Sequence, residues 1–161
     1  MITINTLFKP EVSETEDFNV AMQDAVSIYQ FLQKNEMSIK EIKGNGSTDR
    51  ELYIKDFMTT QLNYTHHVGE MFYSRKSFVV DFYKQTSEEN GIIVEVEGGG
   101  TIPNNHYMKD YEKTQACTKA SFLILIIPCK TIGKVIDTYE YKFSSPSLYD
   151  RGIDGLFLIG Y

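Results

Sequence analysis

Two strand-like runs around a polar turn occupy residues 77–97, which read SFVVDFYKQTSEENGIIVEVE. Residues 77–84 and 92–97 are rich in β-branched and aromatic side chains, as strands are. The dipeptide Asn90-Gly91 between them is a strong signal for a tight turn. Because the connection is short, we expect the two strands to pair as an antiparallel hairpin.

Helical and strand-like segments alternate on both sides of this hairpin. Apolar residues at helical spacing follow the capping sequences Ser13-Glu-Thr-Glu16 and Thr48-Asp-Arg-Glu51. We expect helices at residues 14–34, 48–63, 106–119 and 131–143, a shorter helical piece that ends at 42, and further strands at 121–127 and 155–161. A helix between two strands implies that those strands run parallel, so the order predicts an α/β fold with a mixed sheet.

Length and composition fit one globular domain. The chain has 161 residues, of which 42% are hydrophobic, and carries 16 Lys and Arg against 22 Asp and Glu. Its net charge of −6 argues against binding nucleic acid by overall electrostatic attraction. The two cysteines cannot form a disulfide framework, and no stretch resembles a signal peptide or a membrane span. We expect a single cytoplasmic domain over residues 1–161, with a helical part at 1–46 and the core at 47–161.

Three carboxylates interrupt the apolar hairpin. Side chains alternate across a strand, so Glu95 and Glu97 point to the same face. A register that sets Asp81 opposite Glu95 brings Asp81 to that face too, and the turn length allows it. On an edge strand this face could simply be solvated. In an interior strand, which the flanking apolar residues and the following glycines favour, the carboxylates need a partner, and Mg²⁺ accepts carboxylate oxygens.

These residues resemble the core of the PD-(D/E)XK, or restriction-endonuclease-like, nuclease superfamily. The resemblance covers residues 48–128 and rests on Asp81, on Glu95-Val-Glu97 in the next strand, and on the helix and apolar strand that follow. It implies a four-stranded mixed sheet flanked by helices, cleavage of DNA phosphodiester bonds that depends on Mg²⁺ or Mn²⁺, and a homodimer. Asp81 and Glu95 would bind the metal. Glu97 stands where most members have lysine, as in the subgroup that has glutamate there.

The same resemblance assigns roles to other residues. Water activation falls to Glu97 or to Lys109 or Lys113, which lie four apart on one face of the next helix. A further acid from an upstream segment is frequent in the family. Its candidates are Glu51, Asp56 and Glu70. The candidates for contact with DNA phosphates are Arg75, Lys76 and Lys113, together with Lys109 and Lys119.

Two other interpretations compete with the nuclease. The same fold could serve as a non-catalytic module that binds DNA or a protein. A glycosidase also uses paired carboxylates, but the chain has no Trp for stacking on a sugar. His66 and His67 suggest a metal pair, yet adjacent side chains diverge on any regular element and no Cys or His set completes a zinc site. We therefore expect no metal role for these histidines, and we expect His106 to be a surface helix residue.

Overall fold

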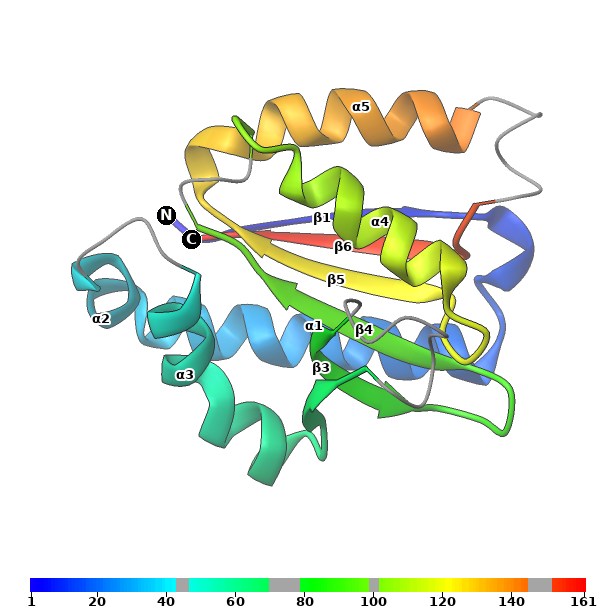
Figure 1. Cartoon of the computed structure of the whole chain (residues 1–161), viewed down its shortest axis with the longest axis horizontal. Coiled ribbons are helices and arrows are strands. Elements are labelled where there is room, and N and C mark those ends of the chain that lie inside the picture. Colours follow the sequence, from blue (N-terminus) through cyan, green and yellow to red (C-terminus); the bar gives the residue numbers. More distant parts are fainter. Residues whose placement is uncertain (43–46, 70–78, 99–101, 145–151) are drawn as a thin grey trace.

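The computed structural model describes residues 1–42, 47–69, 79–98, 102–144 and 152–161 as three layers, with helices on both faces of a central sheet (Figure 1). The sheet has six strands in the order β1-β6-β5-β4-β3-β2. The strands are β1 (Thr3–Phe8), β2 (Thr65–Val68), β3 (Val80–Gln85), β4 (Gly91–Val96), β5 (Phe122–Ile127) and β6 (Gly155–Gly160). The helices are α1 (Glu16–Lys34), α2 (Glu36–Glu41), α3 (Thr48–Asp56), α4 (His106–Ala116) and α5 (Ile132–Ser144).

The α/β class is confirmed, but the prediction of four strands is wrong. The two additional strands, β1 and β2, form the two edges of the sheet. β1 pairs antiparallel with β6 and is only partly buried, and β2 is four residues long and contains two histidines. Edge strands are short and half polar, so neither segment has the apolar run that distinguishes an interior strand. The N-terminal part, predicted as helical, thus also supplies a strand.

The predicted hairpin and its register are confirmed. Phe82 pairs with Val94 and Tyr83 with Ile93, and one further step along this antiparallel ladder sets Asp81 opposite Glu95. β4 then runs parallel to β5, and β5 parallel to β6. All residues of these three strands are buried, as expected for parallel strands that helices cover on both faces.

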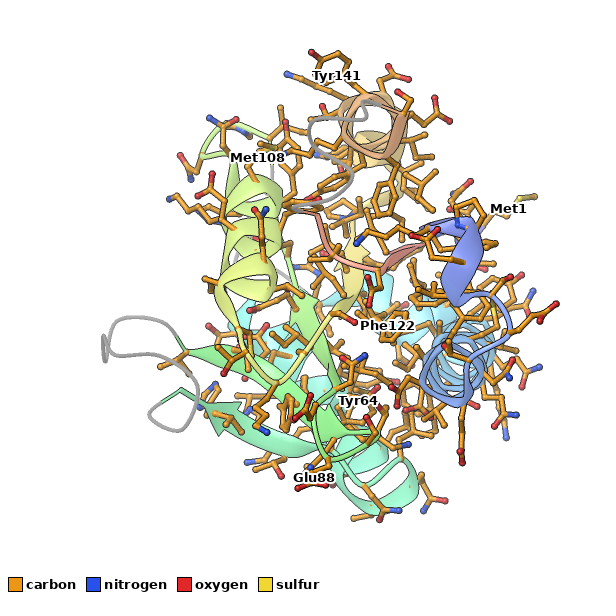
Figure 2. The ribbon with its side chains drawn as sticks, turned by 90° about the vertical axis from the view of Figure 1, so that its right-hand side faces the viewer. Met1, Tyr64, Glu88, Met108, Phe122 and Tyr141 are labelled. Carbon is orange, nitrogen blue, oxygen red and sulfur yellow. The ribbon has the colours of Figure 1, made fainter. Side chains whose placement is uncertain are left out.

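Two apolar layers enclose the sheet. α1, α2 and α3, with a π-helical turn at Phe57–Gln61, cover one face, while α4 and α5 cover the other. Phe122 of β5 lies between the layers and Tyr141 extends outward from α5 (Figure 2). α1 begins later than the capping sequence predicts, because the hydroxyl of Thr15, not that of Ser13, accepts the Phe18 amide hydrogen. Among the described helices, none is both long and apolar enough to cross a membrane.

Candidate functional site

The hairpin brings its three carboxylates to the face of the sheet that α4 covers. Glu95 lies in β4, an interior strand between β3 and β5, and is 3% exposed. Glu97 follows directly after β4 and is 9% exposed. Asp81 lies in β3, the strand next to β4, and its Oδ2 accepts a hydrogen bond from the Val96 amide at 2.8 Å. The alternative of a solvated edge-strand face is therefore wrong.

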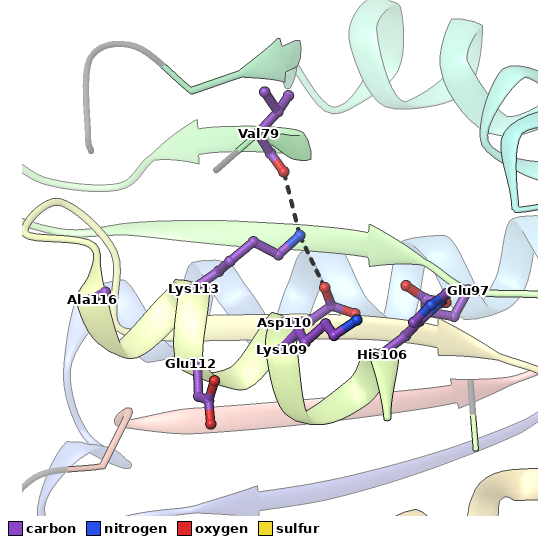
Figure 3. A pocket seen from close by; sticks show the side chains of 8 residues that line it. All are labelled: Val79, Glu97, His106, Lys109, Asp110, Glu112, Lys113 and Ala116. Carbon is purple, nitrogen blue, oxygen red and sulfur yellow. Dashed lines mark hydrogen bonds and ion pairs between the residues drawn. The ribbon is translucent and has the colours of Figure 1, made fainter. Parts of the chain in front are cut away.

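α4 adds a fourth carboxylate and a cation to this group. Asp110 and Lys113 are three residues apart and so lie on one face of the helix, turned toward the sheet. Lys113 Nζ is 2.5 Å from Glu95 Oε1 and 2.9 Å from Asp110 Oδ1, and it also donates to the Val79 carbonyl at 3.3 Å (Figure 3). We call Asp81, Glu95, Glu97, Asp110 and Lys113 the carboxylate cluster. Asp110 was not predicted, although its spacing from Lys113 could have indicated it.

A pocket of about 510 Å³ opens over the cluster. It is lined by Val79, Glu97, His106, Lys109, Asp110, Glu112, Lys113 and Ala116 (Figure 3). His106 Nδ1 lies 2.8 Å from Glu97 Oε2, so this histidine orients the glutamate and is more than the surface residue that the sequence predicts. Asp81 and Glu95 are not among the lining residues. The pocket thus reaches the predicted site from the side of Glu97 and Asp110.

Burial and mutual repulsion raise the pKa values of three acids in the cluster. Burial raises the pKa of Asp81 to about 6, against the hydrogen bond from Val96. Burial and then the charge of Asp110 raise the pKa of Glu97 to about 8. The same two causes raise the pKa of Glu95, while Lys113 opposes them. Burial disfavours the ammonium of Lys113, but the carboxylates of Glu95 and Asp110 outweigh it and raise its pKa. One ammonium therefore does not neutralise this group of acids.

One carboxylate oxygen of the cluster has no hydrogen-bond partner. Asp110 Oδ2 is fully buried and, in the part of the chain that the structure describes, accepts no hydrogen bond. A buried carboxylate oxygen of this kind costs free energy unless a proton or a cation satisfies it. Hard divalent cations such as Mg²⁺ and Mn²⁺ bind carboxylate oxygens. The donor set of the cluster therefore fits such an ion.

The remaining predicted residues fall into three groups. Arg75, Lys76 and Glu70 lie outside the described residues. Lys109 is exposed at the rim of the pocket, whereas the side chain of Lys113, predicted to contact DNA, is only 15% exposed. Glu51 of α3 is the upstream acid whose charge acts on Asp81, and the other described candidate, Asp56, is exposed.

Comparison with protein-family models finds no match to this chain, and neither do comparisons with curated proteins and with solved structures. The resemblance to the restriction-endonuclease-like superfamily consequently rests on the motif residues that the sequence itself presents. What the chain does has to be argued from the chemistry of the cluster and its pocket.

Proposed function

We propose that the carboxylate cluster binds a divalent cation, Mg²⁺ or Mn²⁺, and that the protein is a metal-dependent DNA endonuclease. The observation that carries the proposal is the convergence of four acids, Asp81, Glu95, Glu97 and Asp110, with one ammonium beneath a solvent-connected pocket. Buried carboxylates with raised pKa values are typical of functional sites, because such charges are otherwise unfavourable to folding. Asp110 Oδ2, which accepts no hydrogen bond in the described part of the chain, fits either a cation or a proton shared with Glu97 as its missing partner.

Each residue of the cluster receives a role. Asp81 and Glu95 would hold the cation, as the resemblance implies, with Asp110 as an additional ligand. When bound, the cation would supply positive charge that lowers the pKa of a nearby water and stabilises the phosphoryl oxygens. Glu97, whose orientation His106 fixes, would accept the proton of the water once the bound cation favours its ionised form. In the absence of metal, Lys113 holds Glu95 in place.

The proposed substrate is double-stranded DNA, and the proposed enzyme is a homodimer that cuts both strands. Lys109 is the exposed cation at the rim of the pocket. Arg75 and Lys76 precede the pocket residue Val79 by only a few positions in the chain. These cations would contact phosphates locally, which an acidic protein needs because its overall charge repels DNA. The dimer is tested by the sedimentation of the protein with and without DNA.

Calorimetry and plasmid cleavage test the nuclease together. Asp81→Asn and Glu95→Gln should abolish Mg²⁺ binding and lower plasmid cleavage at least about 100-fold. Glu97→Gln should lower cleavage while Mg²⁺ still binds. Asp137→Asn, which changes an exposed carboxylate on α5, is the matched control and should alter neither. If the unchanged protein binds neither Mg²⁺ nor Mn²⁺, or if cleavage persists in Asp81→Asn, the proposal is refuted.

One observation favours the alternative of a non-catalytic binding module. Lys113 Nζ already lies within 2.9 Å of both Glu95 and Asp110, where a cation would bind. If the ammonium of Lys113 is the cluster's cation, with no metal ion, the cluster would stabilise the fold and would not catalyse a reaction. In that case Lys113→Met would destabilise the protein to the same extent with and without Mg²⁺. In the nuclease, Mg²⁺ would restore the stability of this variant, because the ion would take over the two carboxylates.

A further inference from the structure

Two adjacent histidines and a glutamate converge outside the carboxylate cluster. Glu51 Oε1 lies 2.5 Å from His66 Nε2 and 2.6 Å from His67 Nε2. The two imidazole rings stack with their centroids 3.8 Å apart and their planes at 21°. All three ligand atoms lie within 4.8 Å of one another. Two elements that are distant in the sequence, α3 and the edge strand β2, therefore supply one compact group of donors.

The backbone of His67 explains why neighbouring side chains meet. In a regular strand they would point to opposite faces, and the pairs His66–Phe82 and Val68–Val80 set His67 opposite Asp81. However, His67 has a φ of 54°, in the left-handed region. This conformation turns its imidazole to the side of His66. The sequence argument against a histidine pair assumed a regular element, and that assumption is wrong here.

Ion pairing alone does not account for this arrangement. A left-handed conformation costs a non-glycine residue roughly 1–2 kcal/mol. His67 is 56% exposed, so solvent screens its contact with Glu51, although the Glu51 side chain itself is buried. His66 alone, with its side chain mostly buried, would already satisfy Glu51 Oε1. A metal ion that engages all three side chains at once would offset the cost of the left-handed conformation of His67.

We propose that Glu51, His66 and His67 bind a divalent transition-metal ion of the Zn²⁺ class. Imidazole nitrogen suits Zn²⁺, Co²⁺ and Ni²⁺, whereas Mg²⁺ prefers oxygen, so this ion differs from that of the carboxylate cluster. At a tetrahedral angle, bonds of about 2.0–2.2 Å hold ligand atoms roughly 3.3–3.6 Å apart. The Glu51 oxygen now lies 2.5 and 2.6 Å from the two imidazole nitrogens, so these atoms would have to separate by roughly 0.7–1.1 Å to admit the ion. Exposed His67 gives the ion access to solvent, and three protein ligands leave a position open for water or a ligand.

The site does not depend on the proposed nuclease function. Its ligands come from α3 and β2, whereas the carboxylate cluster is built from β3, β4 and α4. A Co²⁺ titration in the Glu95→Gln background therefore isolates it, since this change removes a ligand of the other site and leaves Asp81, on which the charge of Glu51 acts, unaltered. Visible absorption of Co²⁺ reports nitrogen ligation directly, and it requires no enzymatic activity.

His67→Gly is the decisive variant, because glycine adopts a φ of 54° freely while lacking the imidazole. It should weaken Co²⁺ binding by more than about 100-fold, beyond the usual effect of an outer-shell partner. Its free energy of unfolding without metal should not fall. Glu51→Gln should also weaken binding, whereas His106→Ala, which changes the remaining histidine of the chain, should not. If Co²⁺ causes no absorption change, or if His67→Gly binds it as tightly as the parent protein, the site does not exist.

Discussion

Replacing Lys113 by methionine tests the electrostatic account of the carboxylate cluster. The ammonium is the cation that contacts both Glu95 and Asp110, and its removal leaves two buried carboxylates facing each other. Methionine retains most of the volume of the lysine stem, so the packing of α4 on the sheet stays nearly the same. The variant therefore removes the positive charge with little change in packing.

The magnitude follows from two independent limits. Removing one partner of a buried ion pair costs about 3–5 kcal/mol. A carboxylate can escape by taking up a proton, which costs about 1.36 kcal/mol for each pH unit above its ordinary pKa of 4.5. That limit is about 5 kcal/mol near pH 8 and about 1.5 kcal/mol near pH 5.5. We expect Lys113→Met to lower the free energy of unfolding by about 3–5 kcal/mol near pH 8 and by at most about 1.5 kcal/mol near pH 5.5, where the raised pKa of Glu95 keeps more of this acid protonated in the parent protein as well.

Urea unfolding at the two pH values measures both effects without added metal. Lys109→Met is the matched control, because Lys109 lies on the same helix but is exposed, and it should change stability by no more than about 0.5 kcal/mol. Combining Lys113→Met with Glu95→Gln should recover part of the loss. A deficit below about 1 kcal/mol near pH 8, or an equal deficit at both pH values, would show that Lys113 does not balance buried charge.

Three further predictions concern titration and helix capping. The folded protein keeps protons on Asp81 up to a pKa of about 6 and on Glu97 up to about 8, above their usual values, so without metal the free energy of unfolding should fall as the pH rises from about 4 to 8. Calorimetry against pH measures this trend, and rising stability over that range would contradict it. Glu97→Gln should flatten the decline between about pH 6 and 8 in the same experiment, because glutamine does not ionise. Thr15→Ala should destabilise the protein by about 1 kcal/mol in urea unfolding, since the Phe18 amide loses its capping acceptor, and no change would exclude that cap.

The sequence was sufficient to predict the centre of the sheet. Its hairpin has an unambiguous turn, and a shift of one residue would turn Phe82 and Val94 out of the core, so the pattern of side chains determines the register. The register in turn brings Asp81 and Glu95 to one face. β5 and β6 are apolar throughout, which is sufficient to identify interior parallel strands.

The edges of the sheet and the residues that come from other elements could not be predicted in the same way. β2 begins only three residues after the π-helical turn and consists of only THHV, a string too short and polar to show a strand period. The left-handed φ of His67 depends on the surrounding structure, and no local signal such as glycine marks it. The position of Asp110 beside Glu97 requires the docking of α4 on the sheet, which sequence spacing does not determine.

Lys113 can pair with Glu95 and Asp110 in the absence of metal and contact DNA once the metal is bound. A cation that binds Glu95 and Asp110 competes with the ammonium for the same oxygens, and the structure places the lysine side chain at the wall of the pocket. Displaced from the carboxylates, the ammonium would face the pocket, where the phosphate of a bound strand would lie. Binding of the cation and of DNA would then be linked, and by thermodynamic reciprocity each would strengthen the other by the same factor. The buried ion pair is on this account the metal-free state of the site, and the predicted DNA contact belongs to the state with metal.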